Sequence, residues 1–147
     1  MDELTFATPS VNRGTARRLI DAAAEHAVAI GRAMSIAICD EGGHLKAFDR
    51  MDGATLMSLD VAMRKARTSA SVGAPTHTLQ QAFASDAALA IGGPFITDIM
   101  LIPGGYPIVI GDKLVGGIGV SGGHYSQDQA CAEEALRALG LLAPASP

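Results

Sequence analysis

The stretch VGGIGVSGG, Val115 to Gly123, decides the fold of this 147-residue chain. Gly117, Gly119 and Gly122 have the spacing G-x-G-x-x-G, which in dinucleotide-binding proteins joins a first parallel strand to a helix. That fold also needs a second parallel strand after the helix. Here residues 106–122 are predicted to form a hairpin, and only a short tail follows the final helix. The order of elements therefore argues against a dinucleotide-binding fold.

The glycines instead belong to a strand with one nearly bare face. Between residues 114 and 121, one face carries leucine, isoleucine and valine, whereas Gly117 and Gly119 lie at the centre of the other. The preceding strand is similar, with Ile36 and Ile38 on one face and only serine, alanine and cysteine on the other. Glycine in a strand usually marks the close approach of another group. A closely packed helix is the commoner cause, and a shallow floor for a flat ligand is the alternative.

Two hairpins supply the strands of the predicted sheet. The first runs through AMSIAIC, turns at Asp40–Gly43 and returns through HLKAFDRM. The second lies within residues 106–122 and turns at Gly111–Asp112. The stretch TDIMLIP, residues 97–103, fits either a strand or a loop.

Helices are predicted before, between and after the hairpins. Apolar residues recur at helical spacing over residues 9–30 and 58–73, and a short helical piece over 78–83 leads into a loop. Ser126, with Gln129 three residues later, predicts a capping box at the start of the last helix. The second helix has the apolar face Leu59, Met63, Ala66 and Ala70 and a solvent face that includes Asp60, Arg64 and Arg67.

Hairpins separated by helices predict an α+β fold, in which a central antiparallel sheet is flanked by helices in profilin-like layers. We expect a single domain over residues 1–147, with its core at about 9–140 and a loose tail at 141–147. Aromatic residues make up only 4% of the chain, and glycine and alanine are frequent. A core of such small residues needs closely packed backbones and often oligomerisation to bury enough surface.

Composition excludes several classes of function. Lys and Arg number 11 against 15 Asp and Glu, and the basic residues form no long run, so nucleic acid is not an expected partner. The apolar stretch 87–110 is interrupted by proline and glycine, which argues against a membrane span. The start is acidic and lacks an apolar signal segment. Two cysteines are too few for a disulfide framework, so we expect a cytoplasmic protein.

Four segments in register resemble one known family. They are CDEGGHLKAFDRMDGA (39–54), SLDVAMRKARTSAS (58–71), PIVIGDKLVGGIGVSGG (107–123) and SQDQACAEEAL (126–136). Their order and spacing are similar to those of the HbpS-like/GlcG-like family of haem-degrading domains, which includes the C-terminal domain of PduO-type proteins. The resemblance covers about residues 9–140.

The resemblance implies an α+β domain that assembles as dimers and often as octamers. It also implies haem as the cofactor, with haem degradation or redox sensing in some members. Members of the family occur beside genes of glycolate, diol or aromatic catabolism. A histidine ligand reported on the first helix of PduO-type domains has no match here, because His26 lies about two turns too late.

Histidines are the first candidates for a site. His44 and His124 each follow a pair of glycines at the end of an element, where the backbone can admit a planar ligand, and both are candidate haem ligands or general bases. His77 lies in a loop after a helix and is the fallback ligand. His26 sits on an apolar helical stripe, which is more typical of a packed side chain. No H-x-x-x-H, C-x-x-C or H-E-x-x-H spacing occurs, so we expect no dedicated metal site.

Lys65, beside the apolar face of the second helix, is a candidate catalytic base and a partner for a carboxylate. The resemblance places Lys65 and Thr68 near the family's ligand pocket, with the loop IPGGYP beside them. The amides of Gly104 and Gly105 in this loop would bind a carboxylate or haem propionate. We also expect Ser121, at the end of the glycine strand, to contact the ligand.

Three hypotheses follow. The first is a haem-binding protein of the HbpS/GlcG type. An extended version of this hypothesis adds peroxide-dependent breakdown of haem as an activity. The second is an isomerase, tautomerase or lyase acting on a small organic acid, with Lys65, His44 or His124 as the base. The third is an oligomeric accessory protein without catalysis. In each case we expect a homo-oligomer. It should contain at least two copies, and we favour an octamer of paired dimers.

Overall fold

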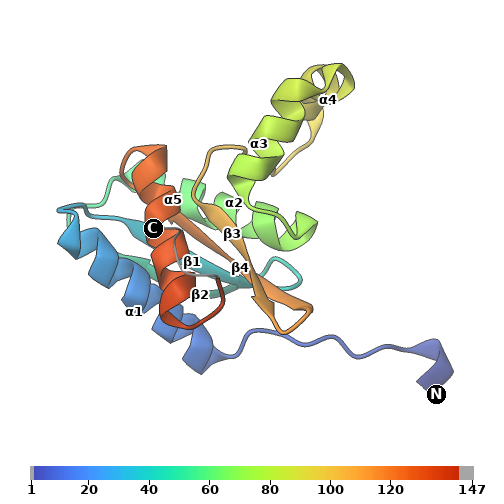
Figure 1. The fold of residues 1–147 in the computed structure, drawn as a ribbon, viewed down its shortest axis with the longest axis horizontal. Coiled ribbons are helices and arrows are strands. Elements are labelled where there is room, and N and C mark those ends of the chain that lie inside the picture. Colours follow the sequence, from blue (N-terminus) through green and yellow to red (C-terminus); the bar gives the residue numbers. More distant parts are fainter. Residues whose placement is uncertain (1, 143–147) are drawn as a thin grey trace.

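The computed structural model describes residues 2–142 and has the predicted α+β fold, with a four-stranded antiparallel sheet of order β2-β1-β4-β3 (Figure 1). The strands are β1 (Ser35–Asp40), β2 (Leu45–Arg50), β3 (Gly105–Ile110) and β4 (Lys113–Ser121). The helices are α1 (Arg13–Ala29), α2 (Leu56–Val72), α3 (Thr76–Ser85), α4 (Ala87–Gly92) and α5 (Tyr125–Ala138), with short 3-10 turns η1 (Asp2–Leu4) and η2 (Gly93–Phe95). Over residues 2–142, every helix is too short or too polar to cross a membrane.

Helices cover both faces of the sheet. Helices α1 and α5 pack together on one face, where Ile36, Ile38 and Ile118 point into the main core. Helix α2 covers the other face and packs its alanines against Ala37 and Cys39. The alternation of large and small residues predicted for β1 and β4 is therefore confirmed, and each face has its own helical layer.

Helix α2 packs directly on the face of β4 that carries Gly117 and Gly119. A Cβ atom at Gly117 would collide with the carbonyl oxygen of Ala66, and one at Gly119 with the carbonyl oxygen of Ala62. Backbone approaches backbone here, so glycine is needed because any side chain would separate the helix from the sheet. The close-packed helix is thus the correct alternative, and the floor for a flat ligand is not open at these glycines.

Helix α2 is rotated relative to its predicted face. Ala66 and Ala70 are buried as expected, but Leu59 and Met63 are only partly buried. The buried set also contains Ser58, Ala62, Lys65, Thr68 and Ser69. The apolar periodicity predicted the wrong buried face for α2, because the close contact with the sheet requires small residues and not only hydrophobic ones.

The last helix begins earlier than its predicted cap. His124, rather than Ser126, is the N-cap, and its Nδ1 accepts a hydrogen bond from the backbone N–H of Ser126. The side chain of Gln127, rather than Gln129, accepts from the N–H of His124 at 3.0 Å. The predicted capping box was therefore wrong by two residues, because His124 caps the helix and the helix begins at Tyr125.

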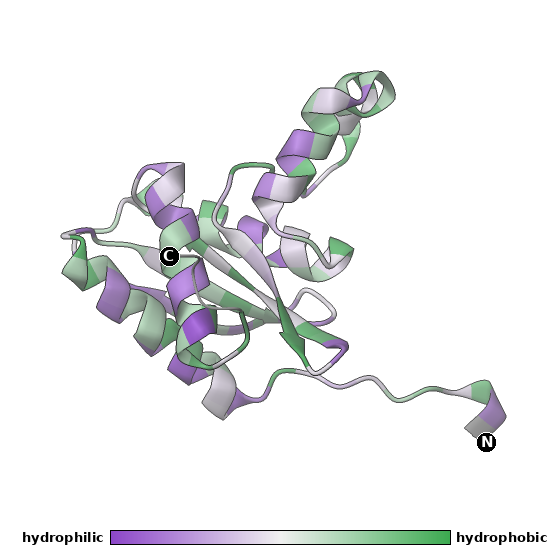
Figure 2. Ribbon diagram, viewed as in Figure 1, coloured by the Kyte–Doolittle hydropathy of each residue, from purple (hydrophilic) through white to green (hydrophobic). Residues whose placement is uncertain are grey.

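Residues 76–96 form an arm that projects from the body of the molecule (Figure 1). The arm contains α3, α4 and η2, where the sequence indicated only a short helix and a loop. Residues 97–103 form no strand. Hydrophobic residues appear in the strands and also near the tip of the arm (Figure 2). At the other end of the chain, Leu141 and Leu142 still pack against the main core, and residues 143–147 of the predicted tail lie outside the described residues.

Candidate functional site

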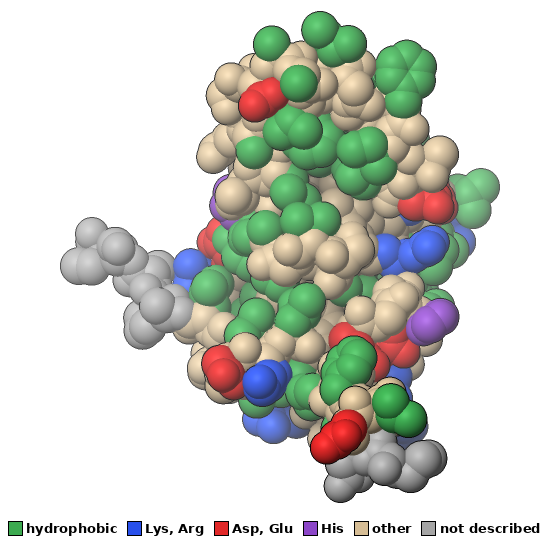
Figure 3. Space-filling model, turned by 90° about the vertical axis from the view of Figure 1, so that its right-hand side faces the viewer, with side chains coloured by type: hydrophobic (Ala, Val, Ile, Leu, Met, Phe, Trp, Pro, Cys, Tyr) green, Lys and Arg blue, Asp and Glu red, His purple; other side chains and the backbone are tan. Residues whose placement is uncertain are grey.

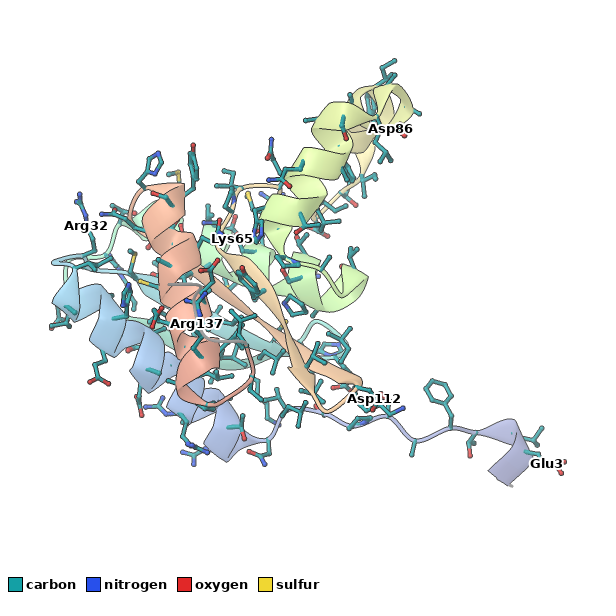
Figure 4. The ribbon with its side chains drawn as sticks, in the orientation of Figure 1. Glu3, Arg32, Lys65, Asp86, Asp112 and Arg137 are labelled. Carbon is teal, nitrogen blue, oxygen red and sulfur yellow. The ribbon has the colours of Figure 1, made fainter. Side chains whose placement is uncertain are left out.

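A buried ion pair joins α2 to α5. Lys65, labelled in Figure 4, is fully buried. Its Nζ donates to Oδ2 of Asp128 at 2.8 Å and to the backbone oxygen of Val120 at 2.9 Å. The other carboxylate oxygen of Asp128 accepts from the N–H of Gly123 at 2.9 Å. Burial lowers the pKa of Lys65 and raises the pKa of Asp128, while the attraction between the two charges opposes both shifts.

The glycine-rich loop closes over this pair. Gly104 has a positive φ of 126°, and a Cβ there would lie 2.8 Å from both Lys65 Nζ and the Cβ of Asp128. The N–H of Gly105 donates to the hydroxyl of Thr76 at 3.0 Å. The glycines are therefore required by close packing around Lys65, and the Gly105 amide already has a protein acceptor.

Thr68 anchors the chain that returns from the arm. Its hydroxyl donates to the backbone oxygen of Arg64 at 2.7 Å and accepts from the N–H of Met100 at 3.0 Å. Ser121 is also largely buried, one residue beyond the carbonyl that Lys65 binds. The structure thus brings Lys65, Thr68, Gly104, Gly105 and Ser121 into the interior between α2 and the sheet.

Two of the four histidines border this interior group. His77 follows Thr76, which accepts from the Gly105 N–H, and His124 follows Gly123, which donates to Asp128. His44 is exposed at the turn of the first hairpin, with Nδ1 3.3 Å from Oδ1 of Asp40. His124 is exposed at the start of α5, and its ring packs on Tyr125 with centroids 4.0 Å apart. His26 is half-buried on α1.

His77 lies in the first turn of α3, not in the predicted loop, and its Nδ1 is buried without a hydrogen-bond partner among the described residues. Its ring lies 5.5 Å from that of Tyr106, whose hydroxyl donates to Oε1 of Glu133 at 2.7 Å. Burial, reinforced by the nearby Glu133 carboxylate, raises the pKa of Tyr106. Burial alone would raise the pKa of Glu133, but hydrogen bonds from Gln129 and Tyr106 and the charge of Arg137 lower it overall. Glu133 is therefore a structural acceptor for Tyr106, Gln129 and Arg137.

Three hollows adjoin two arginines of α2. A cavity of about 330 Å³ lies between the first hairpin and α2. Its lining includes two cations, Arg64 and Arg67, one carboxylate, Asp60, and also His44, Leu45 and Met63. Arg67 also lines an adjoining hollow of about 300 Å³ beside residues 96–99. Arg64 also lines a groove of about 660 Å³ under the arm. Shared lining residues make these three hollows neighbours.

This cationic hollow was missed because Arg64 and Arg67 were assigned to the solvent face of their helix. Their spacing of three residues places them on one side of α2, which was visible in the sequence. That the hairpin turn with His44 would face them was not visible. Among residues 2–142, no group of three or more His, Cys, Asp or Glu side chains is placed to hold a metal ion.

The fold and its site define a small α+β domain whose sheet is covered on both faces and which has three neighbouring hollows beside α2. Comparison with known proteins identifies the class. The family model described as haem degrading protein HbpS-like matches residues 11–137, and the chain belongs to this family. The relation to GlcG and PduO proteins inferred from the four sequence segments is thereby confirmed.

Three relatives illustrate the similarity. The protein GlcG of Escherichia coli (strain K12) is 32% identical over 106 residues, which cover 72% of this chain and 77% of GlcG. The crystal structure of a double mutant of Streptomyces reticuli HbpS is 33% identical with a TM-score of 0.85, over 95% of this chain and 93% of that one. A crystal structure of a PduOC:heme complex is 27% identical with a TM-score of 0.82, over 90% and 96% of the two chains.

Proposed function

We propose that this protein binds haem, and that the hollow between the first hairpin and α2 receives it. The observation that carries the proposal is the juxtaposition of Arg64 and Arg67 with His44 around one cavity. Membership of the HbpS-like family and the similarity to a PduOC domain crystallised with heme support it.

The lining residues fit the chemistry of haem. Two carboxylates entering a protein need cationic partners, and the planar guanidinium groups of Arg64 and Arg67 match a carboxylate well. Imidazole is the usual protein ligand of haem iron, and His44 supplies one at the rim. The apolar side chains of Leu45 and Met63 offer contact to the ring edge. Each of the three hollows has a volume within the range of typical ligand sites, roughly 300–1,000 Å³.

The interior residues predicted from the sequence take a supporting part in this proposal. Lys65 and Thr68 hold α2 and the loop after the arm in place, so that Arg64 and Arg67 are presented to the hollow. His124 and His77 remain the alternative iron ligands. Contacts of Gly104, Gly105 or Ser121 with a haem propionate would require the loop over Lys65 to open.

Spectroscopic titration with hemin tests the proposal. We expect a Soret band shifted from that of free hemin, saturating at one haem per chain or per dimer. His44→Ala should change the spectrum of the complex. Arg64→Gln with Arg67→Gln should weaken binding about tenfold or more, because a charge-assisted hydrogen bond contributes about 1.5–3 kcal/mol.

Lys46→Gln is the matched control for the arginines, because Lys46 is an exposed cation of β2 outside this hollow. His26→Ala controls for loss of a histidine and should alter stability rather than the Soret band. An unsaturable titration refutes haem binding. A spectrum lost in His124→Ala or His77→Ala, but unchanged in His44→Ala, moves the iron to that histidine.

Haem degradation is the further part of the proposal. Addition of hydrogen peroxide to the complex should then bleach the Soret band faster than for free hemin, and catalase should prevent the loss. A complex that stays intact under peroxide would leave haem binding without degradation.

Binding of a small organic acid is the second candidate, because the same two arginines would hold a carboxylate. Catalysis on such an acid has less support, since Lys65 is fully buried against Asp128 and offers no open base. Competition of organic acids with hemin, or binding of acids where hemin fails, would favour this candidate.

We also propose a closed homo-oligomer, at least a dimer and in its full form an octamer. Large apolar side chains are exposed on the arm and near the N-terminus, including Phe6, Ile91 and Phe95. Light scattering after size exclusion should give a multiple of the 15.0 kDa chain, and a monomer at micromolar concentration would refute the assembly.

A further inference from the structure

The arm exposes most of its side chains to water. Within it only Thr76 and Gly93 are buried. The ring of Phe83 packs on Gly93, where a Cβ would lie 2.5 Å from that ring. Ile91 and Phe95 are 75% and 83% exposed. Figure 3 shows hydrophobic side chains gathered over the arm on this side of the molecule. An exposed apolar surface of this kind marks an interaction site.

The arm is also almost uncharged. Asp86 is its only Asp, Glu, Lys or Arg residue, and its side chain accepts from the N–H groups of Ala88 and Leu89 and so caps α4. Each copy of the chain carries a net charge of −4, which opposes association in general, but the arm adds little repulsion to this. Few charges together with exposed aromatic and aliphatic side chains are typical of the centre of a protein interface.

A protruding ring and a groove lie next to each other on the arm. The groove has a volume of about 660 Å³, and its apolar lining includes Phe83, Leu89, Pro94 and Ile96. Phe95 lies between the last two of these in the chain but is not part of the lining. The two charged residues of the lining, Arg64 and Asp98, have opposite signs, so the groove selects no charged partner.

We propose that the arms of two copies pack on each other about a two-fold axis, with Phe95 of each copy in the groove of the other. This inference rests on the homo-oligomer proposed above, of which it names one interface, and it does not depend on haem binding. Because the ring and the groove lie on the same element, one two-fold rotation places each ring over the groove of the other copy. The surface is therefore complementary to itself.

The arm has the size and the need for such a contact. A stable interface takes about 20–30 residues from each partner. The arm contains 21 residues, of which 16 are exposed, and the groove wall on the body adds to them. Its helices α3 and α4 have only 10 and 6 residues, and helices of this length are marginal in water without packing. A second arm would supply that packing.

The absence of tryptophan from the chain allows a direct test. A Phe95→Trp variant carries a single indole, at a position that is exposed in the isolated chain. We expect blue-shifted emission in the oligomer, because the groove of the other copy shields the indole. Dilution until light scattering reports monomers should give the emission of a water-exposed indole.

Two aspartate substitutions provide the matched comparison. Leu89 lines the groove, whereas Val28 is an apolar residue of α1 that is 69% exposed and lies outside it. Adding Leu89→Asp to Phe95→Trp should return the emission to the exposed value and lower the mass of the particle. Adding Val28→Asp should leave the emission blue-shifted. Should Leu89→Asp fail to fold by circular dichroism, Leu89→Ala should give a smaller shift in the same direction.

The outcomes separate this interface from the oligomer itself. An exposed indole in particles that light scattering shows to be oligomers would overturn the arm contact alone. Blue-shifted emission that persists in monomers would overturn it too, because the indole would then lie against its own chain. Equal loss of the blue shift with Leu89→Asp and Val28→Asp would place the contact outside the groove. A wild-type chain that is monomeric at every concentration would overturn the oligomer and the arm contact together.

Discussion

Replacing Lys65 with methionine should destabilise the protein strongly, because it leaves a buried carboxylate without its cation. Both members of the Lys65–Asp128 pair are almost inaccessible to solvent, and Nζ and Oδ2 are 2.8 Å apart. Removing one partner of a buried pair typically costs about 3–5 kcal/mol. Methionine has a similar length and fills most of the same space, so a cavity contributes little of this loss.

The loss should grow with pH. Burial already raises the pKa of Asp128, and removing the Lys65 charge removes the main influence that lowers it. A carboxyl with a raised folded-state pKa stabilises the protein fully below its unfolded pKa of about 3.9, and this contribution is lost as pH rises through the folded pKa. The stability of the variant should therefore fall relative to the wild type between pH 5 and pH 8, by at most about 1.4 kcal/mol per pH unit.

Urea unfolding at pH 5 and pH 8 measures both effects. Adding Asp128→Asn to Lys65→Met should recover much of the loss, because the amide oxygen can still accept from the Gly123 N–H while the buried charge is gone. Lys46→Met, at an exposed position, should cost less than about 1 kcal/mol. A Lys65→Met loss below about 1 kcal/mol, or an equal loss at both pH values, would refute the reasoning.

Two further predictions concern buried positions on the two faces of the sheet. Gly119→Ala should cost at least about 1–3 kcal/mol of stability, because its Cβ would collide with the Ala62 carbonyl oxygen. Gly92→Ala is the control and should be tolerated, because a Cβ there meets no atom within 4 Å. Thermal unfolding measures both variants, and equal melting temperatures would contradict the close approach of α2 to β4. Burial raises the pKa of Cys39 to about 11 and that of Cys131 to about 12. Both thiols should therefore be protonated at pH 8 and should not react with a disulfide reagent until the protein unfolds. Rapid labelling of the native protein would contradict this prediction.

Local sequence patterns determined the strands, their faces and the order of elements. The two hairpin turns at Asp40–Gly43 and Gly111–Asp112 formed as predicted, because turn residues act over a few positions. The alternation around Ile36 and Ile38 fixed which side faces the large core. The four sequence segments also sufficed to identify the family, since they are read along the chain without knowledge of contacts.

Local patterns were weaker where two cues competed. Ser126 and Gln129 have the spacing of a capping box, but the helix begins at Tyr125 because the glycine pair before His124 ends the strand and frees the backbone. The arm was predicted only as a short helix and a loop, because its exposed apolar residues show no single buried face.

The sequence by itself determined the architecture, the family and the residues able to carry chemistry, but not which of them meet. Only the tertiary structure decided that Lys65 is buried against Asp128, 63 positions away, and that Arg64, one residue before it, lines an open hollow. Turn signals and strand alternation depend on near neighbours, so the chain records them directly. The burial of a charge depends on the element that packs against it. One side of α2 is buried because it packs closely on the glycines of β4, whereas Arg64 and Arg67 of the same helix line an open hollow.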